Sequence, residues 1–333
     1  MDGDTLISRE NLVFFVFGYE HPGGLVFSYL KYIPSGLRSC FPLPFLRRCW
    51  RLGDAELVRS EKLYTALNFQ RLMEAFRNRF PDYVYFCPYR RKEVISVPLN
   101  LIKRVYVPKE CLQRLSKRKR KDRLQKLALE LINLLSTESG VLLEDFGIHG
   151  SIALNMHTME SDIDLVVRGS RNFRILEKAI NKLVDEGTLS YVFTKRLDRV
   201  RRHRGRYKNT IFVYNAVRRL EEITSRYGDH RYHPVKPVSF SCQIIDDGEA
   251  MFRPAIYQIT NYQPLDPASE LTEDEIPTVM VSMIGYYRNV ARRGDTVKAS
   301  GMLERVENLE SGRAHHQVVI GTGTRGDEYI WPL

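Results

Sequence analysis

The fold is decided by one stretch of sequence: Phe146-Gly-Ile-His-Gly150-Ser151, then ten residues, then Asp162-Ile-Asp-Leu-Val-Val167. Apolar residues before the glycine and within the second segment predict two strands, at residues 142–148 and 162–167. A short helix is expected between them, and a longer helix with one apolar face is expected at residues 171–185. Strand, helix, strand and helix in this order are typical of an α/β layer architecture.

Two aspartates and a Gly-Ser turn in this stretch carry the candidate chemistry. Side chains alternate along a strand, so Asp162 and Asp164 project to one face, about 6–7 Å apart along the backbone. Carboxylates placed in this way can hold Mg²⁺, or Mn²⁺. Gly150 lets the backbone approach a phosphate closely, and the helix that follows presents free N–H groups. Ser151 can donate its hydroxyl to the same phosphate, which predicts a phosphate site beside a metal site.

These residues resemble the polymerase-β-like nucleotidyltransferase superfamily, whose pattern is a hydrophobic residue, Gly-Gly or Gly-Ser, a short spacer, and Asp-x-Asp within an apolar strand. The resemblance covers residues 145–247, and the rest of the chain is similar to predicted archaeal nucleotidyltransferases of unassigned substrate. It implies a Mg²⁺-dependent enzyme that moves a nucleotidyl group from an NTP to an acceptor and releases pyrophosphate. Asp162 and Asp164 would then be catalytic metal ligands, and Gly150 and Ser151 would hold the triphosphate.

A third carboxylate, which this superfamily usually carries on a later strand, is harder to place. The strand predicted at residues 238–245 contains no acid, so Asp246, directly after it, is the candidate third catalytic residue. If neither Asp246 nor Asp247 reaches the site, catalysis is expected to be weak or lost. The alternative function is therefore a catalytically weak or inactive transferase scaffold that acts as a nucleic-acid-binding protein.

The formal net charge of +11 favours polyanionic partners, of which nucleic acid is the commonest, although many proteins are simply basic. Two basic runs, residues 117–121 and 195–208, make RNA the favoured acceptor; a protein or a small molecule is the alternative. The residues predicted to contact nucleic acid are Lys117, Arg118, Lys119, Arg120, Lys121, Arg201, Arg202, Arg204 and Arg206.

The first basic run is predicted to occupy the first turns of a helix that begins after Ser116. Positive charge at a helix N-terminus opposes the macrodipole. Contact with phosphate is therefore as good an interpretation as a solvated helix end. The second run has no apolar periodicity, and a helix holding Val213 and Val217 is expected after it.

Turns and changes of composition predict an α/β (α+β) chain of several parts. These are a mixed α+β N-terminal domain (1–112), a nucleotidyltransferase-like catalytic domain (113–262), an acidic linker (263–276) and a small all-β, barrel-like domain (277–333). Near the N-terminus, residues 11–17 and 25–32 are expected to form a hairpin. Ser60 is expected to cap a helix that contains Leu63 and Leu67.

Cysteine usage and hydropathy indicate the compartment. The five cysteines are scattered and never form a CxxC pair, which argues against a disulfide framework and a zinc ribbon. No apolar stretch approaches the roughly 20 residues of a membrane helix, and the acidic start, Met1-Asp-Gly-Asp, differs from a signal peptide. A cytoplasmic protein without a membrane partner is expected, and the sequence gives no indication of its oligomeric state.

Overall fold

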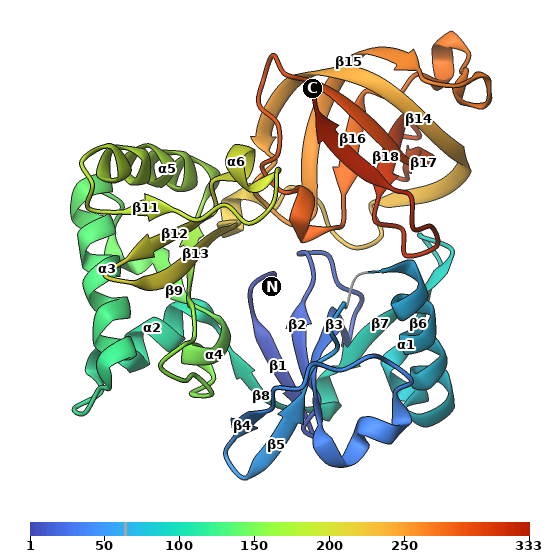
Figure 1. Cartoon of the computed structure of the whole chain (residues 1–333). Coiled ribbons are helices and arrows are strands. Elements are labelled where there is room, and N and C mark those ends of the chain that lie inside the picture. Colours follow the sequence, from blue (N-terminus) through green and yellow to red (C-terminus); the bar gives the residue numbers. More distant parts are fainter. Residues whose placement is uncertain (63–64) are drawn as a thin grey trace.

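The chain folds as a mixed α+β protein built on three β-sheets. The computed structural model describes residues 1–62 and 65–333. Each sheet forms one lobe, and the N-terminal, central and C-terminal lobes meet around the N-terminus of the chain (Figure 1). Among the described residues, no helix has the length and apolar character needed to cross a membrane.

The N-terminal lobe contains an eight-stranded sheet and the helix α1 (Ala66–Arg79). Its strands are β1 (Thr5–Ser8), β2 (Val13–Val16), β3 (Leu25–Pro34), β4 (Trp50–Leu52), β5 (Ala55–Val58), β6 (Val84–Cys87), β7 (Lys92–Pro98) and β8 (Ile102–Tyr106). The order is β4-β5-β3-β2-β1-β8, with β7 paired to β3 and β6 to β7. The predicted hairpin is confirmed, because β2 and β3 pair antiparallel.

The start of α1 differs from the prediction. Thr65, rather than Ser60, caps the helix, and its hydroxyl accepts a hydrogen bond from the N–H of Asn68 at 3.2 Å. Leu67 and Leu72 both belong to α1, but only Leu72 is buried against the sheet. Leu63 lies outside the described residues.

The central lobe has a five-stranded sheet whose apolar face is covered by two long helices. The strands are β9 (Phe146–Ile148), β10 (Ile163–Arg168), β11 (Ser190–Tyr191), β12 (Arg204–Tyr207) and β13 (Thr210–Val217), in the order β11-β12-β13-β10-β9. The helices are α2 (Pro108–Lys117), α3 (Arg123–Ser139), α4 (Gly150–Ala153), α5 (Ser170–Asp185) and α6 (Asp198–Arg201). The apolar stripes of α3 and α5 pack on alternate strand residues such as Leu165 and Tyr214. The opposite face of the sheet is therefore left for other lobes.

The segment predicted as a helix after the second basic run is the strand β13. Phe212, Tyr214 and Ala216 are buried and the residues between them are partly exposed, which is a period of two. Val213 and Val217 also satisfy helical spacing, so the pattern alone was ambiguous. Pairing with β10 on one side and β12 on the other decides in favour of a strand.

The helix predicted from Ser116 is two helices, and the first basic run lies between them. Lys117 ends α2, and α3 begins after Asp122, whose carboxylate accepts the N–H of Gln125 at 2.9 Å. The Gln125 side chain accepts the N–H of Asp122 in return, which completes a capping box. Because a cation stabilises the C-terminus of a helix, the unfavourable charge placement expected from the sequence does not arise.

The C-terminal lobe is a six-stranded sheet that begins well before the predicted barrel. Its strands are β14 (His230–Glu249), β15 (Ala255–Pro264), β16 (Val279–Ser282), β17 (Thr296–Asn308), β18 (Ala314–Ile320) and β19 (Tyr329–Pro332). The order is β14-β15-β16-β18-β17-β19, and β17 also pairs with β14. Residues 277–333 are thus the second part of a larger sheet rather than a separate small barrel. The first part, residues 230–264, comes from the segment assigned to the catalytic domain.

The predicted linker at residues 263–276 packs against the sheet of this lobe. It contains two short 3₁₀ turns, Pro267–Ser269 and Glu273–Glu275. Ser269 is buried, and its hydroxyl oxygen accepts the N–H of Ser239 on β14 at 2.8 Å. The segment therefore connects β15 to β16 within one sheet.

Candidate functional site

The Gly-Ser turn and the aspartate pair meet at the junction of β9, α4 and β10. The strands β9 and β10 pair antiparallel, and the N–H of His149 donates to the carbonyl of Asp164 at 2.9 Å. Gly150 has a φ of +63°, and a Cβ placed on it would lie 2.0 Å from the Asp164 Oδ2 atom. Only glycine fits there, because a side chain would be strained by the backbone angle and would collide with the carboxylate.

Asp162 and Asp164 lie on the sheet face that α3 and α5 leave uncovered. Ile163 and Leu165, which alternate with them, are almost fully buried in the core beneath the helices. Both aspartates are half-buried. The alternation expected of a strand thus brings the two carboxylates to one side of the sheet.

The N-terminal lobe covers this face. Leu154 and Met156, which follow α4, pack in one apolar cluster with Phe15 of β2 and other residues of that lobe. The ring of His149 contacts Phe15 edge-on, with 4.5 Å between ring centres. The Arg48 guanidinium donates to the Thr158 hydroxyl at 2.9 Å. The aspartates therefore lie between two lobes rather than on an open surface.

Three cations surround the carboxylates, each from a different element. Arg204 of β12 forms an ion pair with Asp162, with 3.2 Å between nitrogen and oxygen. Lys31 of β3 and Arg59, which follows β5, lie close enough to Asp164 to interact with its charge. The Nε atoms of Arg59 and Arg204 are buried and have no hydrogen-bond partner among the described residues. These unpaired donors suit an anion such as phosphate.

Burial and neighbouring charges shift the proton affinities of this group. Burial, reinforced by the charge of Asp162, raises the pKa of Asp164 to about 6, against the opposing effect of Lys31, Arg59 and Arg204. Burial, reinforced by Arg59, lowers the pKa of Lys31 to about 7, and Asp164 opposes that shift. A partly buried group of side chains that carries both charge signs has the electrostatic character of many functional sites.

The third carboxylate expected from the resemblance is not with the pair. Asp246 is exposed on β14 of the C-terminal lobe, and its carboxylate accepts the N–H of Gly248 at 2.8 Å. The strand parallel to β10 is β13, where Val213 lies opposite Asp164. In the described part of the chain, no group of three or more His, Cys, Asp or Glu residues is arranged to hold a metal ion. The assignment of Asp246 to the site is corrected, because it lies opposite Gln258 of β15 in the C-terminal sheet, and among the described strands β14 does not pair with β10.

The first basic run borders the segment that leads into the aspartate pair. Lys117, Arg118, Lys119 and Arg120 are exposed, and Lys121 is half-buried. The Arg118 guanidinium donates to the side chain of Asn155 at 3.0 Å, and Asp122 contacts His157 at 2.8 Å. The run therefore lies beside the loop that joins α4 to β10.

The second basic run divides into residues near the site and residues away from it. Arg204 and Arg206 alternate with the buried Gly205 and Tyr207 on β12, so they share the uncovered face of the sheet. Arg201 is buried, and it donates to the carbonyls of Gly285 and Arg288 at 3.0 Å each. Arg202 bonds Asn181 of α5 at 3.1 Å. Arg201 holds two lobes together and Arg202 lies on the helix-covered side, so neither is placed to contact nucleic acid at this site.

Lys31 and Arg59 were missed at the level of the sequence. They come from a lobe without any motif, and more than a hundred positions separate Lys31 from Asp164. No local pattern marks a lysine on a strand or an arginine after one as part of a remote site. Only the packing of the N-terminal lobe on α4 places them there.

By its architecture the chain is a mixed α+β protein with three sheets, and comparisons with known proteins add one relative. The chain is 25% identical to an uncharacterised protein of Methanocaldococcus jannaschii, over 98% of this chain and 97% of the relative. The similarity thus extends over all three lobes. No family model matches the chain, and no solved structure matches it.

Proposed function

We propose that this protein is a Mg²⁺-dependent nucleotidyltransferase that moves a nucleotidyl group from an NTP to an acceptor. The observation that carries the proposal is the contact between the Gly-Ser turn and the aspartate pair, in which Gly150 lies directly against the Asp164 carboxylate. This contact puts a phosphate-compatible turn beside two carboxylates, one on β10 and one directly before it. The order of glycine, serine and paired aspartates along the chain supports a nucleotidyltransferase-like core for the central lobe.

The two aspartates fit a Mg²⁺ ion that arrives with its nucleotide. Mg²⁺ is commonly held by one or two carboxylates, with waters and substrate phosphates completing its shell. Asp162 and Asp164 share a face, and the same oxygen donors suit Mn²⁺. When bound, the metal would neutralise charge on the phosphates and orient them. The ion pair between Arg204 and Asp162 would open as the arginine turns to phosphate.

The proposed step is a displacement at the α-phosphorus of the NTP. A hydroxyl oxygen of the acceptor bonds to that phosphorus, the bond from phosphorus to the β-phosphate oxygen breaks, and pyrophosphate leaves. The hydroxyl proton passes to water. Lys31, Arg59 and Arg204 stabilise the negative charge of the triphosphate, and the N–H groups and hydroxyl of the Gly150-Ser151 turn hold it in position.

RNA is the acceptor that the charge distribution supports best. Exposed residues of the first basic run border the loop before Asp162, and Arg206 lies exposed on the sheet face opposite α3 and α5. Arrays of this kind follow a phosphate backbone. A protein or small-molecule acceptor is the alternative within the same chemistry.

One observation favours a second function, that of an inactive scaffold that binds nucleic acid. Val213 lies opposite Asp164 on the neighbouring strand, where a carboxylate could have joined the pair. A site with two acids binds a metal-nucleotide complex more weakly than a site with three, and transfer can be lost while the basic surface is retained.

Incubation with Mg²⁺, each α-labelled NTP and total cellular RNA tests the proposal. We expect label to enter the acceptor fraction with the wild-type protein and not with Asp162→Asn or Asp164→Asn. Asp246→Asn is the matched control, because it removes an acid of the same type outside the site, and it should retain activity. If either Asp162→Asn or Asp164→Asn still transferred label to the acceptor, the proposal would be contradicted. Salt-dependent RNA binding without transfer by the wild type would favour the scaffold.

A further inference from the structure

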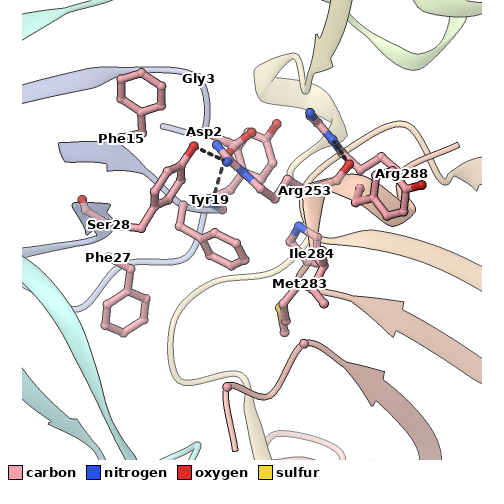
Figure 2. A pocket seen from close by; sticks show the side chains of 18 of the residues that line it. Asp2, Gly3, Phe15, Tyr19, Phe27, Ser28, Arg253, Met283, Ile284 and Arg288 are labelled. Atoms are coloured by element: carbon pink, nitrogen blue, oxygen red, sulfur yellow. Dashed lines mark hydrogen bonds and ion pairs between the residues drawn. The ribbon is translucent and has the colours of Figure 1, made fainter. Parts of the chain in front are cut away.

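A large cavity lies where the three lobes meet. Its volume is about 830 Å³, and residues from all three sheets line it. Figure 2 shows Phe15, Tyr19 and Phe27 of the N-terminal lobe on one side and Met283 and Ile284 of the C-terminal lobe on the other, with Arg253 extending between them to Asp2. Small-molecule sites commonly enclose about 300–1,000 Å³. The cavity is therefore large enough for a ligand of substantial size.

The lining of the cavity carries excess positive charge, and its acids are already engaged. Lysine and arginine outnumber aspartate and glutamate there by eight to five. All five acids have partners in the structure. Asp2 pairs with Arg253, Glu20 with Arg90, and Glu249 with Arg218, while Glu222 accepts the N–H of Ser170 and Glu328 accepts the N–H of Gly321.

In the described part of the chain, four cations of the lining form no ion pair with a carboxylate, and one of them, Arg201, donates to two backbone carbonyls instead. Among the described residues, no carboxylate lies within ion-pair distance of Lys31, Lys92 or Arg288. Arg288 donates to the side-chain oxygen of Asn215 at 2.6 Å, which keeps its guanidinium beside β13. Burial is the first cause that lowers the pKa of Lys92 and of Arg288. Acids act on these cations only from beyond ion-pair distance: Asp164 on Lys31, Glu304 and Glu328 on Lys92, and Asp2 on Arg288. Buried cations without a direct ion pair favour an anionic ligand.

The lining combines residues from several parts of the chain. Lys31, which interacts with the charge of Asp164, lines the cavity together with His149. Lys92 and a glycine-rich turn at residues 321–326 also line it, and the turn packs on α1 so closely that a Cβ on Gly323 would lie 2.8 Å from the Phe69 ring. Aromatic rings of β2 and β3 complete this part of the lining. Flat apolar surface combined with cations suits a ring that carries phosphate.

We infer that the central cavity binds a nucleoside phosphate, either free or as the terminal nucleotide of an RNA strand. Its base would lie among the aromatic residues of the N-terminal lobe, and its phosphate would be held by Lys92 or Arg288. Because Lys31 and His149, which line the cavity, both interact with Asp164, the bound nucleotide is the acceptor. The role of this nucleotide as the acceptor rests on the proposed function, whereas its binding in the cavity does not.

Calorimetric titration in EDTA tests the binding without the metal site. The probes are the four nucleoside 5′-monophosphates, the corresponding nucleosides, inorganic phosphate and a short single-stranded RNA. We expect at least one monophosphate or the RNA to bind the wild-type protein and the Asp162→Asn, Asp164→Asn double variant equally. Loss of one charge-assisted contact in Lys92→Gln should weaken binding about tenfold. Lys103→Gln is the control, because Lys103 is exposed on β8 and outside the cavity.

The outcomes separate the cavity from the transfer reaction. Absence of binding by every monophosphate and by the RNA overturns the inference. So does binding that survives both Lys92→Gln and a second variant, Arg288→Gln, or inorganic phosphate that binds as tightly as the nucleotides. Binding as described, in a protein that transfers no label to any acceptor, supports the cavity site and contradicts the proposed function alone. The RNA and monophosphate titrations identify which source the cavity accepts.

Discussion

At the scale of single residues, the contact of Gly150 with Asp164 joins fold and chemistry in one place. The glycine adopts a left-handed φ and leaves no room for a Cβ beside the carboxylate. Glycine is therefore required at position 150 for a steric reason that is independent of any phosphate. A test of phosphate binding at this turn must therefore separate steric damage from lost affinity.

A double-mutant cycle measures the steric part of the effect. Gly150→Ala should destabilise the protein by about 1–3 kcal/mol through backbone strain and collision with Asp164. In an Asp164→Ala background the same substitution should cost less, because the nearest remaining atom of residue 164 is its Cβ, 3.3 Å away. Denaturant unfolding measures both differences. Equal destabilisation in the two backgrounds would show that the carboxylate does not constrain the glycine.

His21 gives a second prediction at this scale. Its Nδ1 accepts the N–H of Phe27 at 3.2 Å, and burial lowers its pKa to about 4. The unfolded chain takes up the proton near pH 6.5, so the contribution of His21 is complete above that pH and is lost as the pH falls toward 4. His21→Asn keeps an acceptor but cannot titrate, so it should lose less stability than the wild type between pH 7 and pH 4.5. Parallel unfolding curves across this range would contradict the assignment.

At the scale of elements, the basic runs are separated by the strands and helices that carry them. Alternation on β12 brings Arg204 and Arg206 to the face of Asp162, whereas Arg202, just after α6, lies against α5. The loop between α2 and α3 brings the first run to the edge of the same face. The net charge of the sequence does not show which basic residues lie on the face of Asp162 and which lie on the other side of the lobe.

The salt dependence of RNA binding tests which of these basic residues contact phosphate. Neutralising Lys119, Arg120 and Arg206 to glutamine should flatten the log–log slope by roughly two units, since each phosphate contacted on a single strand contributes about −0.7. Arg202→Gln is the control of like charge on the other side of the lobe, and it should leave the slope unchanged. If Arg202→Gln flattens the slope by about 0.7, as much as each of the three substitutions is expected to contribute, binding is not confined to the face of the aspartates.

At the scale of the whole molecule, the C-terminal sheet determines where the chain can be divided. The predicted boundary near residue 262 falls within the last residues of β15, which pairs with β16 in one sheet. The longest pairing of that sheet joins β14 to β17. Separating them would expose unpaired backbone groups and the apolar core between the strands.

Two truncated chains test this division. A chain that ends at residue 262 should aggregate, because β14 and β15 lose β16 and β17. A chain that ends at residue 229 removes the whole sheet and should remain more soluble. Light scattering and dye binding to exposed apolar surface compare the two. A soluble, cooperatively folding 1–262 chain would favour the boundary expected from the sequence.

The local pattern around the aspartate pair could be predicted from the sequence, and the assignments that depended on remote partners could not. The strand at residues 163–168, the helix that follows it and the hairpin of β2 and β3 were recognisable, because period and turn residues are local properties. Val213 and Val217 fit two periods, so β13 was misassigned. Asp246 was placed near the pair because it follows an apolar strand closely in the chain, but that strand belongs to another sheet.

The sequence by itself determined that Asp162 and Asp164 share a strand face and that a glycine precedes them at a turn, since backbone geometry requires no partner for either. Only the tertiary structure decided which groups meet them. It brought Lys31 and Arg59 from the N-terminal lobe, directed Arg204 but not Arg201 to the site, and left Asp246 outside. The physical reason is that strand pairing and apolar packing act between segments far apart in the chain. Their outcome depends on complementary surfaces that no local pattern encodes.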